Sequence, residues 1–224
     1  MPAQRTRSRY LYRILSYRHV VDLFRSKELH FTAPRTWEDP YEQWLEHSRS
    51  HAMYAQCWGL RPVSDAMWRI YSSDRTAVRI RTSFASLSTV LDAACQSGAI
   101  EYFIKEVEYC KPQDLRIRLQ NIRESLQSGF AVEHAVKGLC LKRDAFDHET
   151  EVRIIVHDCR LSDSVSARQG LRISVDPHAI VDSIMFDPRA DNDFMRVVRH
   201  YLRTAVEFKG DIGKSLLYRP PFAV

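Results

Sequence analysis

The stretch HETEVRIIVHD, from His148 to Asp158, has the alternating pattern of a β-strand. Successive side chains of an extended chain point to opposite faces. On that spacing, one face carries the apolar residues Val152, Ile154 and Val156. The opposite face carries the charged residues Glu149, Glu151 and Arg153. The apolar face predicts a hydrophobic core, and the charged face is either exposed to water or the floor of a polar site.

The two alternatives for the charged face differ in energy. Burying it would cost several kcal/mol per unpaired charge unless the acids and the arginine neutralise one another or a ligand. A carboxylate held in that way can bind a sugar hydroxyl or stabilise a cation, and an arginine can bind a phosphate. The competing interpretation is an edge strand whose polar side lies in water.

The bulk composition favours one folded, water-soluble domain. The chain has 224 residues, 45% of them apolar, which is enough for a sizeable core. Neither a membrane span nor a secretory signal is visible, so we expect a cytoplasmic protein that does not contact a membrane. The net charge is +5, and part of it lies in an N-terminal arm, residues 1–9, at Arg5, Arg7 and Arg9. That arm either contacts a phosphate backbone or is a solvated terminus.

The spacing of apolar residues and turn signals predicts strands and helices without a strict alternation. We expect strands at Tyr10–Leu15 and in the segments ELHFTA, MYAQCWGL, TAVRIRTS, AIEYFIKEVEYC, LRISV and IVDSIMF. Helices are expected after the first strand, after Asp39 and Ser64, over Phe84–Cys95 and after a cap at Asp191 or Asn192. The prediction is an α+β fold with a mixed, mainly antiparallel sheet flanked by helices. It forms a single domain over residues 10–224, with a charged helical insertion near 112–136.

Common enzyme signatures are absent from the sequence. It has no phosphate-binding glycine loop, no dinucleotide fingerprint and no HExxH or GxSxG motif. The five cysteines are widely spread and without metal-ligand spacing, which predicts reduced, mostly buried thiols and no metal site. Function must therefore rest on charged and aromatic residues within the predicted elements.

Several of those residues have both a binding and a structural interpretation. Arg13 and Arg79 lie on otherwise apolar strands and would reach a phosphate, or else extend to the surface. Four aromatic residues would stack on a planar ring or else fill the core: Tyr12, Trp37, Trp68 and Tyr71.

The order of the segments resembles a known family. The succession is LYRIL, ELHFTAPRTWEDPYE, CWG, MWRIYSSDRTAVRIR and KRDAFDHETEVRII. It is similar to bacterial domain-of-unknown-function family two-nine-seven-one, which has an "FNDP-E"-like turn, an "MW-x-x-Y" helix and an "E-x-E-[aromatic]-R" strand. Three features depart from that pattern: Trp37-Glu38 in the turn, Val152 in the strand, and a long charged insertion between Cys110 and Ala135.

A more distant resemblance is to the ADP-ribosyltransferases. It implies a split sheet core and NAD as the cofactor. Glu151 would be the catalytic acid, and Glu149 its partner facing the acceptor. Arg13 would hold the cofactor's phosphates or amide region, and Trp68 or Tyr71 would stack on the nicotinamide. Three further residues would complete the cofactor site: Tyr12, Arg79 and Arg153.

Three functional hypotheses follow from these patterns. The first is an NAD-dependent ADP-ribosyltransferase or NAD glycohydrolase, a toxin or phage-defence effector with a nucleic-acid or protein acceptor. The second is a non-enzymatic nucleotide- or partner-binding module of a defence or toxin–antitoxin system, in which the charged residues form a structural network. The third is a nuclease, with a metal site near His148 and His157 that uses Asp147 and Asp158.

Overall fold

The structure is a computed structural model that describes residues 10–44, 47–161 and 168–221. The predicted basic arm, residues 1–9, lies outside the described residues. The chain divides into two compact units. Unit 1 comprises Met1–Leu29, Gly59–Val90 and Ser174–Val224, and unit 2 comprises His30–Trp58 and Leu91–Ile173.

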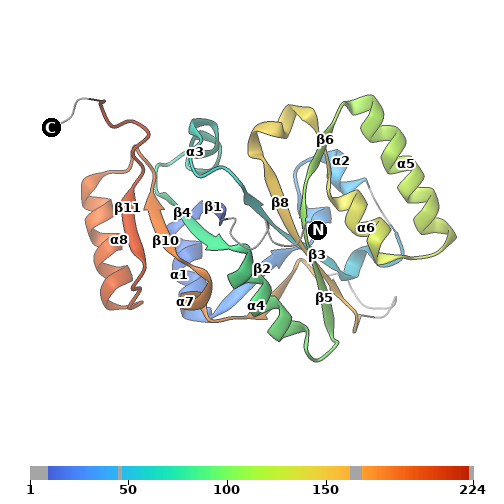
Figure 1. The fold of residues 1–224 in the computed structure, drawn as a ribbon, viewed down its shortest axis with the longest axis horizontal. Helices are drawn as coiled ribbons and strands as arrows, with labels where there is room; N and C mark the ends of the chain where they lie inside the picture. The colour runs from blue at the N-terminus through green and yellow to red at the C-terminus, as the bar shows by residue number, and fades with distance from the viewer. Residues whose placement is uncertain (1–9, 45–46, 162–167, 222–224) are drawn as a thin grey trace. The chain divides into compact units, whose positions relative to one another are not determined.

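Unit 1 is built on strands that pair mainly antiparallel (Figure 1). They are β1 (Tyr10–Ser16), β4 (Ala77–Ser83), β10 (Ser183–Phe186) and β11 (Asp211–Lys214). β1 pairs with β4 antiparallel along its whole length, β4 pairs with β10 antiparallel, and β10 pairs with β11 parallel. The apolar alternation of these strands supplies core residues such as Leu11, Ile80 and Phe186.

The helices of unit 1 begin at side-chain caps. They are α1 (Tyr17–Ser26), α3 (Asp65–Tyr71), α7 (Pro177–Ile180) and α8 (Asn192–Thr204). Ser16, Ser64, Asp176 and Asp191 each accept a hydrogen bond from a backbone N–H group in the first turn. α1 packs against β1 and β4, and Phe24 on its buried face meets Phe208 at 5.6 Å between ring centroids.

Unit 2 contains the strand pairs around the opening stretch of sequence. Its strands are β5 (Ile100–Glu106), β6 (Glu108–Cys110), β7 (Leu141–Arg143) and β8 (Glu151–Asp158). β2 (Glu28–Thr32), β3 (Met53–Gly59) and β9 (Gly170–Ser174) belong to it in most of their length. β8 pairs with both β3 and β5, β2 pairs with β3 and β9, and β6 pairs with β7 parallel.

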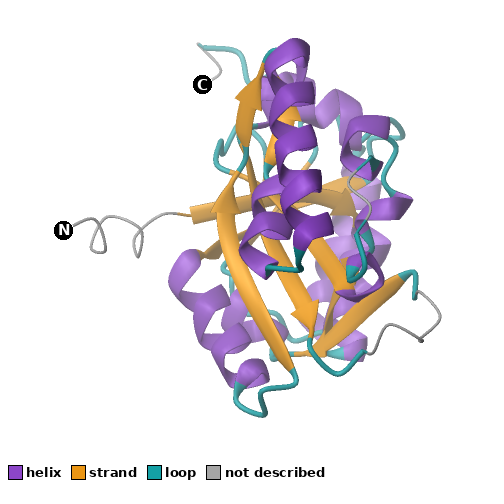
Figure 2. Ribbon diagram, turned by 90° about the vertical axis from the view of Figure 1, so that its right-hand side faces the viewer, coloured by secondary structure: helices purple, strands orange, loops and turns teal. Residues whose placement is uncertain are grey.

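Two helices supply much of the core of unit 2. α5 (Pro112–Ser128) and α6 (Val132–Leu139) pack on apolar residues of β3, β7 and β8. Figure 2, in which this helical side faces the viewer, shows helices in front of the strands. α5 buries four residues at helical spacing: Leu115, Leu119, Ile122 and Leu126. The segment near 112–136, predicted as a charged helical insertion, is therefore two core-forming helices that separate near Gly129.

The remaining elements are short or cross between the units. α4 (Phe84–Cys95) has the predicted bounds. α2 (Pro40–Gln43) is a single turn capped by Asp39, the predicted cap. The 3-10 helices are η1 (Pro34–Thr36), η2 (Ser50–Ala52) and η3 (Asp144–Glu149).

The segment His148–Asp158 is not one continuous strand. β8 begins at Glu151, whereas Glu149 ends η3, and Thr150 between them has a left-handed backbone with φ 43°. All eight residues of β8 are buried, and the strand has a neighbour on both sides. The alternative of an exposed edge strand is therefore wrong.

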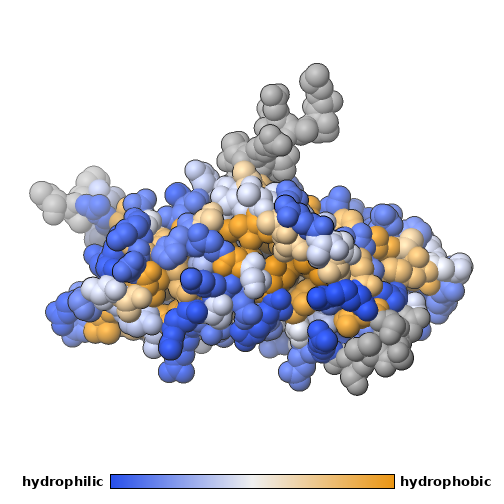
Figure 3. Space-filling view, turned by 90° about the horizontal axis from the view of Figure 1, so that it is seen from below, coloured by the Kyte–Doolittle hydropathy of each residue, from blue (hydrophilic) through white to orange (hydrophobic). Residues whose placement is uncertain are grey.

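The predicted fold class is confirmed: the protein is α+β, with a mixed, mainly antiparallel sheet flanked by helices. Of the cysteines, predicted as mostly buried, Cys140 is buried and Cys159 is exposed. Hydrophobic residues reach the surface among hydrophilic ones (Figure 3). Within the described residues, no helix combines the length and the apolar character needed to cross a membrane.

Candidate functional site

Five charged side chains meet inside unit 2, and we call them the buried charge cluster: Glu42, Lys142, Glu149, Glu151 and Arg153. They come from α2, β7, the end of η3 and β8. Each side chain is at most 9% exposed. When all three carboxylates are ionised, the cluster carries one net negative charge.

Arg153 is the centre of the buried charge cluster. Its Nε donates to Glu151 Oε1 at 2.8 Å, and its Nη2 donates to Glu151 Oε2 at 3.0 Å. Nη1 donates to the Leu139 carbonyl at 2.5 Å, and Nη2 also donates to Glu42 Oε1. The Trp37 ring lies 4.5 Å from the guanidinium carbon, in a cation–π contact. These contacts fix a guanidinium that is only 1% exposed.

Lys142 joins the remaining carboxylates. Its Nζ donates to Glu149 Oε2 at 2.7 Å and to Glu151 Oε2 at 3.1 Å, and it lies 3.9 Å from Glu42 Oε1. Strand alternation predicted that Glu149, Glu151 and Arg153 share a polar face. In the structure Glu149 lies at the end of η3, and Lys142 on β7 links it to Glu151.

The two carboxylates bonded to Arg153 differ in acidity. Burial alone would raise the pKa of Glu151, but Arg153 and Lys142 outweigh it and lower that pKa to about 2. For Glu42, burial outweighs the attraction of Arg153 and Lys142 and raises its pKa above the usual value. Carboxylates whose pKa values are pushed apart are typical of acid–base sites, and also occur in structural ion-pair networks.

Glu42 was not among the predicted site residues. Asp39 caps α2 by accepting from the Tyr41 N–H at 3.0 Å, and Arg143 donates to the same Asp39 oxygen at 3.1 Å. Pro40 at the first helical position fixes the turn, so the glutamate two residues later points to Arg153. The acid of the "FNDP-E"-like turn was the sequence signal that would have identified it.

A cavity of about 490 Å³ borders the buried charge cluster at Glu42. Leu139, whose carbonyl accepts from Arg153, also lines it. Arginines and histidines contribute to its wall: Arg35, Arg123, His47 and His51. Burial, with a smaller effect of the neighbouring His157 and His51, lowers the pKa of His47 to about 4. His47 is therefore neutral at neutral pH, while Arg35 and Arg123 supply positive charge and Glu42 supplies a carboxylate. The volume is within the usual range for small-molecule sites.

The other predicted site residues lie in unit 1. Arg79 is buried and its guanidinium lies 4.9 Å from the Tyr12 ring centroid, so these two are brought together. Arg13 is half-buried and pairs across to Ile80. Trp68 is 1% exposed and Tyr71 is 47% exposed, so the structure places Trp68 in the core and leaves Tyr71 accessible. The carbonyls of Trp68 and Ser72 accept from Arg189, a contact not predicted.

Two residues of the nuclease hypothesis, His157 and Asp158, have ion-pair partners outside the four residues of that hypothesis. His157 Nδ1 lies 2.7 Å from Glu101 Oε1, and the buried Asp158 pairs with Arg160 at 2.7 Å.

Fold and site together define an α+β protein with a buried charge cluster beside a cavity walled by arginine. Residues 67–154 match the family described as "Protein of unknown function (DUF2971)", which confirms the resemblance inferred from the motifs. The sequence has no match among curated proteins.

Among solved structures, the chain is similar to DarT from Thermus sp. 2.9. The structure of that protein in complex with NAD+ shares 10% sequence identity and has a TM-score of 0.42, with 92% of this chain and 94% of that chain covered. The structure in complex with carba-NAD+ shares 10% identity, has a TM-score of 0.41 and covers 92% of this chain and 95% of that chain. The structure in complex with ADP-ribosylated single-stranded DNA shares 9% identity, has a TM-score of 0.42 and covers 92% and 93%.

Proposed function

We propose that this protein is an NAD-dependent ADP-ribosyltransferase or NAD glycohydrolase whose substrate enters the cavity of unit 2. The observation that carries the proposal is that cations and a carboxylate line the same cavity. Arg35 and Arg123 are on its wall together with the carboxylate of Glu42. Arginine suits the pyrophosphate of a dinucleotide, and a carboxylate suits a ribose hydroxyl or a developing positive charge.

The proposed chemistry breaks the bond between nicotinamide and the ribose carbon C1′. Nicotinamide leaves with the bonding electron pair, the ribose carbon passes through an oxocarbenium-like state, and water or an acceptor group forms the new bond and loses a proton. Glu42, whose pKa burial raises, is suited to take that proton. The net negative charge of the buried charge cluster favours the cationic state.

Within this proposal Glu151 acts through Arg153. Both of its oxygens bond Arg153, and Arg153 in turn bonds Glu42. The direct catalytic roles predicted for Glu151 and Glu149 stay predictions. So do the predicted cofactor contacts: Arg13, Tyr12, Trp68, Tyr71, Arg79 and Arg153.

The test measures nicotinamide release from NAD by the 224-residue chain, with single-stranded DNA or protein as acceptor. We expect Glu42→Gln to lower the rate by about a hundredfold or more, because it removes a charge and a proton acceptor at nearly constant volume. Glu133→Gln, at an exposed position on α6, is the matched control and should keep the wild-type rate. Near-ultraviolet circular dichroism establishes that each variant is folded.

A second candidate function, a non-enzymatic nucleotide-binding module, is favoured by one observation. Every nitrogen of the Arg153 guanidinium already has a partner inside the protein, as a structural ion-pair network requires. On that hypothesis NAD or another nucleotide raises the melting temperature without release of nicotinamide. Glu42→Gln would then lower the melting temperature, with no turnover to lose. Absence of nicotinamide release by the folded wild-type chain with either acceptor would overturn the enzymatic proposal.

A further inference from the structure

A second group of chemically reactive side chains lies in unit 2, outside the buried charge cluster. Glu101 is on β5, His157 is on β8, and Cys159 follows the end of β8. Glu101 and His157 are directly opposite each other in the antiparallel β5–β8 pair. The Cys159 N–H donates to the Ala99 carbonyl at 3.0 Å, which holds the thiol at the end of the same pair. The backbone ladder therefore fixes all three positions.

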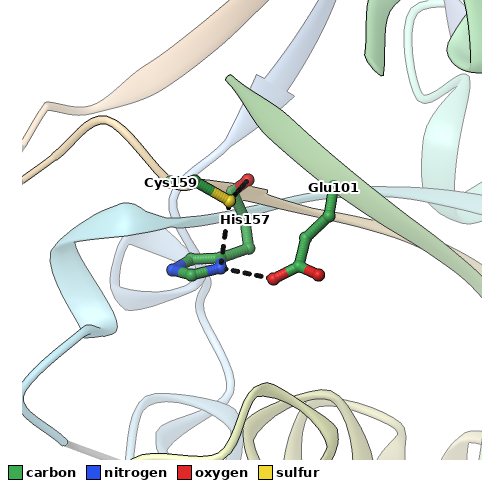
Figure 4. A group of neighbouring side chains, drawn as sticks. All are labelled: Glu101, His157 and Cys159. Atoms are coloured by element: carbon green, nitrogen blue, oxygen red, sulfur yellow. Dashed lines mark hydrogen bonds and ion pairs between the residues drawn. The ribbon is translucent and has the colours of Figure 1, made fainter. Parts of the chain in front are cut away.

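The three side chains converge on one ring nitrogen (Figure 4). Glu101 Oε1 lies 2.7 Å from His157 Nδ1, and Cys159 Sγ lies 3.8 Å from the same atom. A nucleophile–histidine–acid relay places the acid and the nucleophile on opposite ring nitrogens. Here both meet Nδ1, so the arrangement does not fit a relay, whereas it fits donors that share one cation.

The donor set also suits a particular ion. A carboxylate oxygen, an imidazole nitrogen and a thiolate sulfur are all ligands of Zn²⁺, with bonds of roughly 2.0 to 2.3 Å. The three donor atoms lie within 4.8 Å of one another. Tetrahedral bonds of those lengths place ligand atoms roughly 3.3 to 3.6 Å apart, so small rotations of Glu101 and Cys159 suffice.

One of the three side chains is buried and the other two are accessible, as a metal site open to solvent requires. The His157 side chain is 8% exposed, which fixes the ring, and the Phe130 ring lies between it and His47 of the cavity wall. The Glu101 side chain is 42% exposed and Cys159 is exposed. Metal and solvent therefore have access from one side. Three protein ligands with an open position are typical of Zn²⁺ sites that keep a water molecule or a substrate group.

We propose that Glu101, His157 and Cys159 form a Zn²⁺ site with a solvent-accessible coordination position. On binding, the Cys159 thiol loses its proton to solvent and the thiolate coordinates the ion, so affinity falls as pH falls. The inference does not depend on the proposed NAD chemistry, because none of the three residues lines the cavity beside Glu42.

The test uses the reduced 224-residue chain after treatment with a chelator. The chain is titrated with Zn²⁺ in competition with a chromophoric chelator. We expect a single Zn²⁺ to bind per chain and to raise the melting temperature. Co²⁺ in its place should give the near-ultraviolet charge-transfer absorption of a thiolate ligand.

Two variants at the more accessible ligands avoid disturbing the buried His157 ring. Cys159→Ser and Glu101→Gln should each weaken Zn²⁺ binding by about tenfold or more. Cys110→Ser, a half-buried thiol of the same unit, is the control and should bind within about twofold of the wild type. Cys95 is unsuitable as a control, because its thiol interacts electrostatically with Cys159 and Glu101. The proposal is overturned if the wild type binds no Zn²⁺ at micromolar concentration, or if both ligand variants retain its affinity.

Discussion

At Glu151, burial and charge pairing act in opposite directions on a single carboxylate. Removing it from water disfavours its ionised form, and two cations within hydrogen-bond reach favour that form. The lowered pKa of about 2 means that pairing outweighs burial. Glu42, which shares Arg153, shows the opposite balance. The attraction of the same arginine therefore outweighs burial at Glu151 and is outweighed by burial at Glu42.

The stability of the chain should depend on Glu151 and on pH together. Its pKa is lower in the folded chain than in the unfolded chain, so the unfolded chain takes up the proton first as pH falls. The stabilisation is therefore fully present above about pH 5 and is lost as pH falls towards about 2. We expect Glu151→Gln to lower the free energy of unfolding at pH 7 by about 3 kcal/mol.

Chemical denaturation of wild type and variant at a series of pH values measures this difference. Glu133→Gln should show no comparable loss at any pH, since its carboxylate is exposed. A difference between wild type and Glu151→Gln that stays constant between pH 7 and pH 3 would contradict the assigned pairing.

The elements of this fold were predictable where their signals are local. α4 has the predicted bounds, α3 begins at the predicted cap Ser64, and α8 begins at Asp191, one of its two predicted caps. Periodicity and capping are properties of neighbouring residues, so one sequence suffices to find them. β7 and β11, of 3 and 4 residues, were not predicted.

The candidate site was predictable only in part, for a related reason. The charged residues of the opening stretch identified Glu149, Glu151 and Arg153 as a group, and the cost of burying them predicted partners. The partner Glu42 is 111 residues from Arg153 in sequence, and no local pattern links the two. Thr150, in a left-handed conformation that is uncommon for threonine, moves Glu149 off the strand without a glycine to mark the turn.

α5 supplies the clearest test of an element. Leu119 is 3% exposed in the core of unit 2, and Ile117 on the same helix is 60% exposed. Leu119→Ala should lower the free energy of unfolding by about 2 to 5 kcal/mol, because it removes buried methyl groups and leaves a cavity. Ile117→Ala should change it by less than about 0.5 kcal/mol. Urea denaturation of both variants measures the contrast, and equal effects would mean that α5 does not pack through this face.

At the scale of the whole molecule, net charge is the property that bears on an acceptor. The chain carries +5 at pH 7 with a pI near 9.0, and three of its arginines are Arg5, Arg7 and Arg9. A protein that neutralises phosphates releases counterions, so its affinity for a nucleic acid falls as salt rises. If the N-terminal arm contacts the backbone of single-stranded DNA, removing its arginines should make the affinity less dependent on salt.

Replacing Arg5, Arg7 and Arg9 by alanine removes three charges and lowers the net charge from +5 to +2. For a single strand, three lost phosphate contacts should reduce the slope of log affinity against log salt by about 2. The matched control replaces three exposed arginines elsewhere, Arg25, Arg116 and Arg199, and reaches the same net charge. Fluorescence anisotropy of a labelled oligonucleotide over a salt series measures both slopes. Equal slopes for the two triple variants would show that charge acts through the molecule's overall field, and that the arm has no particular part in binding.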